Sequence, residues 1–416
     1  MSEDEERQHH RRNLLAIYRT ALEAVDGRLR VRQALHERQM PSPLYAVAIG
    51  KAATSMMAGA CDALGGGLAS GLVITKGGYA ESLFPAGAPV RCLEASHPVP
   101  DESSLVAGRE LLEFIADAPS EASFLFLVSG GASSLVEVLP EGLGTDFFRR
   151  TNEWLLASGL PIGAMNRVRK RVSCIKGGRL ACYLNGRAAL NLLVSDVPGD
   201  DPRVIGSGLL IPHHSEDLGL RGICLPEWLD TVAGKAPPLP PRSAFRAVRS
   251  EIVARPADAG RAAARAGEEY GYTVYVYDDL VTGEAGDAGR QIVQEVTAGP
   301  TGLRVWMGET TVHLPPRPGR GGRCQSLALA AAMEMAGRTD LYLLAVGTDG
   351  TDGPGQDAGA LVDGGTVERG CRSGLEPEAC LAAADAGSFL EASGDLVHTG
   401  PTGTNVMDLH LVLKTP

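Results

Sequence analysis

The chain has 416 residues, of which 44% are hydrophobic and 21% charged, so it can form two or three domains with real cores and is not a disordered protein. Its 39 Lys and Arg residues against 50 Asp and Glu residues give a net charge of −11, which disfavours nucleic acid or an anionic membrane surface as the main partner. The 52 glycines exceed average usage, and we expect the excess in loops that approach a ligand closely.

The opening segment, MSEDEERQHHRR, is polar, and no later segment approaches about 18 consecutive apolar residues. We therefore expect no signal peptide and no spanning helix, and predict a cytoplasmic protein. The eight cysteines lack CxxC spacing and are predicted to be free thiols. The adjacent His213 and His214 are predicted to lie in a solvated loop rather than on a metal ion.

Apolar residues recur at helical spacing between Glu5 and Glu37, which predicts one long amphipathic helix or two shorter ones. Short apolar runs then alternate with helix-like stretches, a pattern typical of a parallel sheet with crossover helices. The predicted strands are Leu44–Ile49, Gly71–Thr75, Val90–Ala95, Ser123–Val128 and Ala188–Ser195. Ligands bind at the carboxyl ends of strands in open α/β sheets, so the loops after these strands should line one edge.

The proline-rich stretch within residues 237–242 is too stiff for a helix or central strand and predicts a domain boundary. A second α/β pattern follows it. The predicted elements are helices near Pro256–Tyr270 and Arg323–Ala336, with strands at Tyr272–Tyr277, Leu303–Met307, Leu341–Val346 and Val406–Leu413. We therefore predict an N-terminal Rossmann-like α/β domain over residues 1–236, a linker over 237–242 and a C-terminal α/β domain over 243–416.

Four glycine-bearing loops, at residues 129–134, 318–323, 347–353 and 399–405, adjoin predicted strands or helices. Each one alone could be a plain turn, but four in one chain favour binding of a nucleotide or another phosphate, above all where a loop runs into a helix N-terminus at Arg323. Neither GxxxxGK[ST] nor a GxGxxG after a strand occurs, which disfavours a Walker-type P-loop protein and a Rossmann dehydrogenase.

Charged residues cluster near several predicted strand ends. Carboxylates at residues 196–201 and at Asp349 and Asp352 are either solvated turn residues or ligands of a cation, for which Mg²⁺ is the natural choice beside phosphate loops. Basic residues gather between Asn166 and Arg179, as a solvated helix face or an anion site. Lys51 directly follows a strand, where its point charge could reach a phosphate or a substrate carboxylate.

These motifs, in this order, resemble the glycerate 2-kinase family, whose C-terminal half carries the MOFRL domain. The resemblance covers almost the whole chain. Its motifs are Gly50-Lys51-Ala52-Ala53, residues 97–101, 129–131, 166–170, 176–181, 195–201 and 308–311, Gly319-Arg320-Gly321-Gly322-Arg323, and residues 348–353 and 399–406.

The resemblance implies two α/β domains, the first a Rossmann-like parallel sheet with helices on both faces and the second a smaller mixed-sheet domain, with the active site in a cleft between them. It further implies ATP and Mg²⁺, and transfer of the γ-phosphoryl group to a hydroxyl of a small hydroxy acid such as D-glycerate. No nucleic acid or membrane partner is expected, and a homodimer is compatible with the sequence. An NAD(P)-dependent hydroxypyruvate or tartronate reductase, and a degenerate nucleotide-binding protein without catalysis, remain as alternatives.

In that family, a Lys matching Lys51 and an Arg matching Arg323 are the proposed catalytic pair. The matched loops imply substrate- or phosphate-binding residues at Ser129, Gly130, Gly131, Ser133, Asn166, Arg169, Lys170, Lys176, Glu309, Thr310, Gly321, Gly322, Thr399, Gly400, Thr402 and Asn405. The implied metal ligands are Asp196, Asp200, Asp349 and Asp352.

The chain also departs from the family pattern. Cys324 and Ser326 stand where the family usually has Asn and Glu after the Arg. Three further departures lie elsewhere in the motifs, at Ala164 in place of Glu, Arg171 in place of His, and Leu209-Leu210 in place of Pro-Thr. Because they remove groups that could bind a polyhydroxy acid, we expect a divergent acceptor, with D-glycerate a poor or secondary substrate. Drift compensated by neighbouring residues is the alternative.

Overall fold

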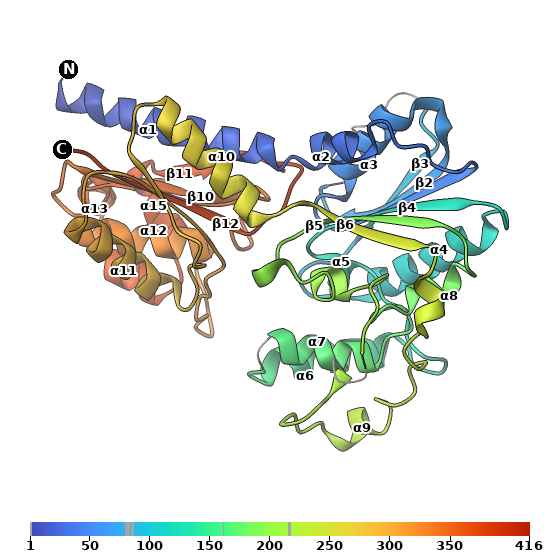
Figure 1. Cartoon of the computed structure of the whole chain (residues 1–416). Coiled ribbons are helices and arrows are strands. Elements are labelled where there is room, and N and C mark those ends of the chain that lie inside the picture. Colours follow the sequence, from blue (N-terminus) through green and yellow to red (C-terminus); the bar gives the residue numbers. More distant parts are fainter. Residues whose placement is uncertain (1, 80–83, 85–86, 161, 215–217) are drawn as a thin grey trace. The chain divides into compact units, whose positions relative to one another are not determined.

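The computed structural model describes residues 2–79, 84, 87–160, 162–214 and 218–416. The chain divides into two compact units. The first comprises Gly27–Ala254, and the second combines Met1–Asp26 with Arg255–Pro416 (Figure 1).

The first unit is built on a six-stranded parallel sheet with the strand order β3-β2-β1-β4-β5-β6. Its strands are β1 (Leu44–Ile49), β2 (Leu68–Lys76), β3 (Val90–Ala95), β4 (Ser123–Val128), β5 (Ala189–Val194) and β6 (Val248–Ala254). The five predicted strands are all present, and the predicted Rossmann-like sheet is confirmed. The strand order reverses between β1 and β4, which is the position where open α/β sheets bind their ligands.

Helices cover both faces of this sheet. Figure 1 shows α2 (Gly27–Leu35) and α3 (Ala53–Leu64) on one face, with α4 (Glu102–Asp117), α5 (Ala132–Leu135) and α8 (Leu180–Tyr183) on the other. A smaller apolar cluster of its own joins α6 (Thr145–Ala157), α7 (Ile162–Arg171) and α9 (Glu227–Asp230). Within the described residues of this unit, short 3-10 helices also lie at Gly65–Gly67, Pro198–Asp200, Ile205–Ser207 and Arg242–Phe245.

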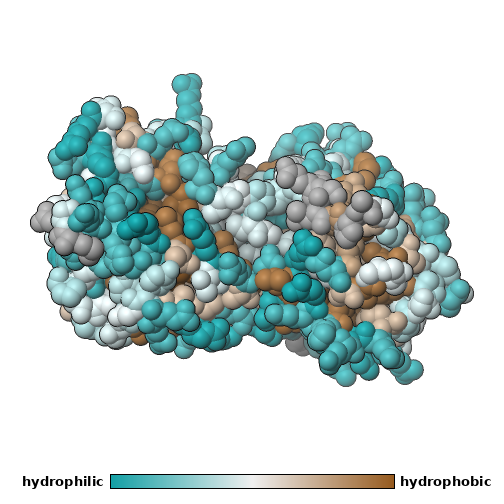
Figure 2. Space-filling model, turned by 90° about the horizontal axis from the view of Figure 1, so that it is seen from above, coloured by the Kyte–Doolittle hydropathy of each residue, from teal (hydrophilic) through white to brown (hydrophobic). Residues whose placement is uncertain are grey.

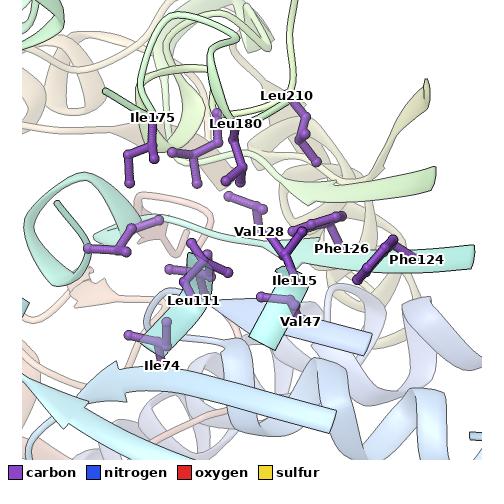
Figure 3. Close-up of a cluster of buried hydrophobic side chains, with 14 of the residues drawn as sticks. Val47, Ile74, Leu111, Ile115, Phe124, Phe126, Val128, Ile175, Leu180 and Leu210 are labelled. Carbon is purple, nitrogen blue, oxygen red and sulfur yellow. The ribbon is translucent and has the colours of Figure 1, made fainter. Parts of the chain in front are cut away.

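The core on the α4 face of the sheet anchors the loops that follow the strands. In Figure 3, Val128 at the end of β4 lies near side chains from α4 and from the segments around Ile175 and Leu210. Ile175, Leu180 and Leu210 are almost completely buried. The segments at residues 173–180 and 205–211 are therefore held against the sheet by apolar burial, close to where β4 ends.

The second unit has a mixed six-stranded sheet in the order β11-β10-β9-β12-β8-β7, in which only β7 and β8 pair in parallel. Its strands are β7 (Val274–Val276), β8 (Gly302–Gly308), β9 (Leu341–Gly347), β10 (Asp357–Asp363), β11 (Leu396–His398) and β12 (Asp408–Lys414). This sheet confirms the predicted mixed architecture.

Helices also cover both faces of the second sheet. Figure 1 shows α1 (Glu3–Ala24) and α10 (Pro256–Glu269) on one face, with α11 (Ala285–Ala298), α12 (Arg323–Glu334), α13 (Thr366–Cys371) and α15 (Ala386–Ser393) on the other. The short helix α14 (Pro377–Ala382) packs against α12 and α15.

The division into units differs from the predicted domains, residues 1–236 and 243–416, at both boundaries. Helix α1 packs against α10 and β9, and Arg11 donates to Asp363 and Asp395 at 2.5 and 2.8 Å, so the N-terminal helix belongs to the second unit. Strand β6 follows the proline-rich stretch but pairs with β5, so the first unit extends to Ala254. Neither long-range partner can be read from local composition.

His410 occupies a buried position in β12, where its neighbours across the sheet are Trp306 of β8 and Ala345 of β9. Neither ring nitrogen has a hydrogen-bond partner among the described residues. Burial, with a smaller contribution from Arg323, lowers the pKa of His410 from 6.5 to about 3. The folded protein therefore excludes a proton that the unfolded chain binds below about pH 6.5, and stability falls as the pH drops through that range.

We predict that His410 alone lowers the free energy of unfolding by about 2 kcal/mol between pH 7 and pH 5. A His410→Leu variant should lack this component, since leucine binds no proton in either state. Urea unfolding of both proteins at the two pH values measures the difference. Parallel pH dependence of the two proteins would contradict the prediction.

The surface in Figure 2 is predominantly hydrophilic, with smaller hydrophobic areas between the polar residues. Within the described parts of the chain, no helix is both long enough and apolar enough to cross a membrane. All eight cysteines are free thiols, as predicted, and four of them are buried.

Candidate active site

The first candidate region lies where the strand order of the parallel sheet reverses. Lys51 directly follows β1, and its backbone N–H donates to the Gly130 carbonyl after β4 at 2.9 Å. The next amide, that of Ala52, donates to Ser129 Oγ at 3.0 Å. The loops after β1 and β4 thus form one hydrogen-bonded unit that holds Lys51 at the carboxyl edge of the sheet.

Two glycines permit this close approach. A Cβ atom on Gly50, whose φ is +131°, would lie 2.2 Å from Ser129 Oγ. A Cβ atom on Gly131, whose φ is +84°, would lie 3.0 Å from the His97 ring and 3.3 Å from Lys51 Cγ. The side chains of Lys51 and His97 therefore flank the Gly131 backbone, a position that suits a small anionic ligand.

Ser129 and Gly130 were predicted to bind phosphate, and the structure places them differently. Ser129 is completely buried, and its hydroxyl oxygen accepts a hydrogen bond from the Ala52 amide in the loop after β1. The Gly130 carbonyl accepts a hydrogen bond from the Lys51 amide. These two residues therefore position Lys51. Ser133 is bonded through Oγ to Ser207 Oγ at 2.8 Å, which joins the loop after β4 to the segment at residues 203–213.

The predicted basic residues occupy different environments. Asn166 Oδ1 accepts from the Arg169 guanidinium at 3.3 Å, and burial lowers the pKa of Arg169. Lys170 is 6% exposed and donates to the Arg203 carbonyl at 3.0 Å and to His213 Nε2 at 2.9 Å. The prediction that His213 lies in a solvated loop is wrong, because this side chain is buried against Lys170; His214 beside it is exposed.

Lys176 is completely buried, and its ammonium group forms an ion pair with Glu137. Ser173 Oγ and the Val138 amide donate to the same carboxylate at 2.6 and 2.9 Å. Burial lowers the pKa of Lys176, although Glu137 opposes that shift. This arrangement assigns Lys176 to a buried ion pair that holds residues 173–177 in place, rather than to the predicted contact with substrate.

We predict that Glu137→Leu lowers the free energy of unfolding by about 3–5 kcal/mol, because it leaves the Lys176 ammonium buried without its counter-ion. The double variant Glu137→Leu/Lys176→Met should recover most of this loss, since an apolar pair of similar volume needs no charge compensation. Urea unfolding of the three proteins tests the pair. Equal stability of the single and double variants would contradict the assignment.

The second candidate region lies in the other unit, where three of the four glycine-bearing loops interlock. A Cβ atom on Gly322 would lie 2.3 Å from Asp352 Oδ1, and one on Gly353 would lie 2.4 Å from the Gly321 carbonyl. A Cβ atom on Gly350 would lie 2.0 Å from the Gly400 carbonyl. Close backbone approach thus joins the loops at residues 318–323, 347–353 and 399–405.

Other predicted residues also lie in this loop cluster. Thr402 Oγ1 donates to the Thr348 carbonyl at 2.5 Å, and Thr399 lies beside Gly350. Asn405 is 6% exposed. Thr310 is almost completely buried, and its Oγ1 has no hydrogen-bond partner among the described residues. The sequence motifs of the second unit therefore come together at one end of its sheet.

Arg323, the first residue of α12, is held by two carboxylates in this cluster. Its Nε and Nη2 atoms donate to Asp408 at 2.6 and 3.0 Å, and Nη1 donates to Glu309 Oε1 at 2.6 Å. The Asp408 carboxyl is buried, whereas the Arg323 side chain is one-third exposed. The bidentate contact fixes the orientation of the guanidinium group and leaves part of it accessible.

The N-terminus of α12 was expected to bind phosphate, but an internal carboxylate occupies it. Both oxygens of Asp352 accept from this helix end, from the amides of Cys324 at 3.0 Å and Gln325 at 2.8 Å. Burial raises the pKa of Asp352 to about 7, and these two amides oppose the shift. Asp352 therefore caps α12 instead of acting as the predicted metal ligand.

The remaining predicted metal ligands differ in accessibility. Asp349 is buried, and its Oδ1 accepts from the backbone and hydroxyl groups of Thr351. Asp196 and Asp200 lie in the turn after β5 and are partly exposed. Across the described ranges, no group of three or more His, Cys, Asp or Glu side chains is arranged to hold a metal ion. A Mg²⁺ ion that is bound together with a phosphate group needs only one or two carboxylates from the protein. Asp196 and Asp200 could supply them.

Most of the departures from the family pattern fall on buried positions. Cys324 is completely buried, Ser326 is 3% exposed and Ala164 is 6% exposed. Leu209 and Leu210 belong to the core shown in Figure 3. Because these side chains pack inside the protein, their burial favours the alternative of drift compensated by neighbouring residues, and a low activity with D-glycerate stays a prediction.

Several residues that matter here were not singled out from the sequence. Glu137 lies in a hydrophobic segment with no motif, and Asp408 begins a strand in which apolar residues predominate. His97 was part of a family-like motif but was given no role. Only the pairing of each residue with a distant partner identifies it.

Comparisons with known proteins agree with this arrangement. The model described as "Domain of unknown function (DUF4147)" matches residues 13–224, and the MOFRL family model matches residues 302–408. The chain is 37% identical to a putative hydroxypyruvate reductase of Agrobacterium vitis, covering 97% of this chain and 94% of that protein. It is 32% identical to a glycerate 2-kinase of Pyrococcus horikoshii, covering 96% of this chain and 93% of that protein.

The fold agrees with a solved structure over almost its whole length. The crystal structure of a glycerate kinase from Thermotoga maritima covers 98% of this chain, with 100% of its own chain matched, at 34% identity and a TM-score of 0.83. Both the sequence motifs and the two-unit α/β architecture are therefore shared across nearly full-length proteins. The chain belongs to the glycerate kinase family.

Proposed function

We propose that this protein is a kinase that transfers the γ-phosphoryl group of ATP to a hydroxyl group of D-glycerate or a closely related hydroxy acid. The observation that carries the proposal is the position of Lys51, a cation held by the loops after β1 and β4 where the strand order reverses. Membership of the glycerate kinase family supports this reaction class.

The described side chains can supply the two requirements of phosphoryl transfer, which are positioning and charge neutralisation. Lys51 would bind the transferring phosphoryl group or the substrate carboxylate, while Ser129 and Gly130 hold its loop in place. Arg323 would stabilise negative charge that develops on the phosphoryl oxygens, with Asp408 fixing its orientation.

Magnesium is the divalent ion that we propose for this reaction. Of the predicted ligands, Asp196 and Asp200 fit best, because they are partly exposed at a strand end, whereas Asp352 is committed to capping α12. The ion would neutralise phosphate charge when bound together with ATP.

The test is ADP release, measured with a coupled assay and D-glycerate as acceptor, in the presence and absence of Mg²⁺. We expect release that depends on both, and a phosphoglycerate product detectable by ³¹P NMR. L-glycerate and tartronate serve as comparison acceptors. If no hydroxy acid raises ADP release above the ATP-only background, the kinase proposal fails. ATP binding measured by calorimetry without turnover would then favour the degenerate nucleotide-binding alternative.

A hydroxypyruvate or tartronate reductase is the second candidate, because two relatives from Agrobacterium vitis carry a reductase name and the sheet has a dinucleotide-binding strand order. The turn after β1 argues against it. The amides of Lys51, Ala52 and Ala53 donate to Gly130, Ser129 and Gly50, respectively, so they are not directed at a pyrophosphate. Sustained oxidation of NADH or NADPH with hydroxypyruvate would favour the reductase over the kinase.

A further inference from the structure

Within the described residues, two carboxylates contact the Arg323 guanidinium, and they differ in accessibility. Asp408 accepts from Nε at 2.6 Å and from Nη2 at 3.0 Å, and its side chain is 2% exposed. Glu309 accepts from Nη1 alone, at 2.6 Å, and its side chain is 44% exposed. The guanidinium group therefore has one buried partner at two points and one exposed partner at a single point.

The two carboxylates also differ in what each loses when it leaves Arg323. A buried carboxylate that loses its counter-ion keeps an uncompensated charge away from water, so separation of Asp408 is strongly unfavourable. An exposed carboxylate is hydrated when it leaves, and exposed ion pairs contribute little to stability. Asp408 is therefore the permanent partner of Arg323, whereas Glu309 is the partner that another anion can replace.

The backbone that carries Glu309 is fixed, so only its side chain has to move. The Glu309 amide donates to the Val281 carbonyl at 2.9 Å, and the Thr311 amide donates to the Gly283 carbonyl at 2.8 Å. These hydrogen bonds do not involve the Glu309 carboxylate. Release of Arg323 thus needs a rotation of one exposed side chain and no movement of the loop that carries it.

A phosphate group suits the position that Glu309 would leave. A guanidinium group has five N–H donors, and in the described part of the chain Arg323 uses three of them, all on the two carboxylates. Without Glu309, the Nη1 and Nη2 atoms present two parallel N–H donors along one edge, the arrangement that binds phosphate at two points. Asp408 lies on the other edge, formed by Nε and Nη2, and stays in place.

We propose that the Glu309 carboxylate is a displaceable counter-ion, which holds Nη1 of Arg323 in the free protein and gives way to a phosphate group of ATP. This inference rests on the proposed kinase function. Glu309 was expected to bind a substrate or phosphate, whereas here it competes with phosphate, because it occupies Nη1 and its charge repels phosphate oxygens. Asp408 thus sets the orientation of Arg323, and Glu309 sets its affinity for ATP.

Titration calorimetry and steady-state kinetics of Glu309 variants test the competition. Glu309→Ala removes the carboxylate and Glu309→Gln removes its charge, so both should lower the Kd and the KM of ATP by about 3- to 10-fold. Glu368→Gln is the matched control, because Glu368 forms an exposed contact of 2.6 Å with Arg372 in the same unit, and it should leave both constants unchanged.

Three results of this comparison would overturn the inference. An unchanged or raised Kd of ATP in both Glu309 variants would show that the carboxylate does not compete with phosphate. A fall in the KM of D-glycerate instead of that of ATP would show that Glu309 is displaced by a carboxylate. A tenfold or larger fall in kcat without tighter ATP binding would show that Glu309 supports the reaction itself.

Glu309→Asp separates the contact with Arg323 from the charge alone. Aspartate keeps the negative charge but is one methylene shorter, so on the fixed backbone it does not reach Nη1 as glutamate does. Displacement predicts that Glu309→Asp also binds ATP more tightly than the unmodified protein, by about two- to fivefold. Equal Kd values for these two proteins would reduce Glu309 to a general repulsive charge and overturn the proposed exchange.

ATP binding is measured without an acceptor, so it judges the inference apart from catalysis. If no hydroxy acid is phosphorylated but the Ala and Gln variants bind ATP more tightly, the proposed function fails and the role of Glu309 stands. If D-glycerate is phosphorylated but neither variant binds ATP more tightly, the kinase stands and the inference fails. Inorganic tripolyphosphate is the second probe, and absence of binding of both probes to all of these proteins would also refute the inference.

Discussion

The Lys51→Met variant is expected to lose at least about a thousandfold in kcat with D-glycerate while keeping its free energy of unfolding. Methionine preserves most of the side-chain length but removes the positive charge that the loops after β1 and β4 hold beside Gly131 and His97. The hydrogen bonds that fix this loop use the backbone amide of residue 51 and should survive the substitution.

The matched control is Lys235→Met, which removes an exposed lysine of the same unit and should leave kcat unchanged. Coupled ADP release gives kcat, and urea unfolding with circular dichroism gives stability. A Lys51→Met protein with near-normal kcat would remove Lys51 from the mechanism, whereas an unfolded variant would show that the loop needs the charge for its structure.

The second large effect is expected for Arg323→Met, with a loss of about a thousandfold in kcat together with a decrease of about 1–3 kcal/mol in the free energy of unfolding. The catalytic loss follows from removal of the oriented guanidinium group. The stability loss follows because Asp408 is buried and would keep neither of its two hydrogen bonds from Arg323. From the sequence alone, little loss of stability is expected, since Arg323 was placed on a loop.

The double variant Arg323→Met/Asp408→Leu separates the two effects, because it removes the unpaired carboxyl and should recover stability without recovering activity. Arg338→Met is the control, since Arg338 forms a similar two-point contact with the partly exposed Asp340. Recovery of kcat in the double variant would show that Arg323 acts only through the fold.

The burial of Cys324 and Ser326, two departures from the family pattern, could not be predicted from the sequence. Cys324 and Ser326 directly follow Arg323, and proximity in sequence suggests that they face the substrate. Both are buried instead, because every residue of α12 from Cys324 to Ala332 is buried inside the second unit. How much of a helix is buried depends on the elements that pack around it, here α11, α14, α15 and the strands β9 and β10.

The sequence by itself determined the α/β class, most strands of both sheets and the positions of Lys51 and Arg323 at element ends. These features are local: a buried strand needs a continuous apolar run, and glycine or a polar residue must end it. The mixed character of the second sheet was expected from family resemblance rather than from periodicity.

Only the tertiary structure decided which polar groups remain available for a ligand. Ser129 braces Lys51, Asp352 caps α12, and Lys176 is neutralised by Glu137, although each was expected to bind a substrate or metal. It also assigned α1 to the second unit and placed His213 Nε2 2.9 Å from Lys170 Nζ. The physical reason is that a buried polar group must find a partner, and in a folded chain that partner often lies tens or hundreds of residues away in sequence.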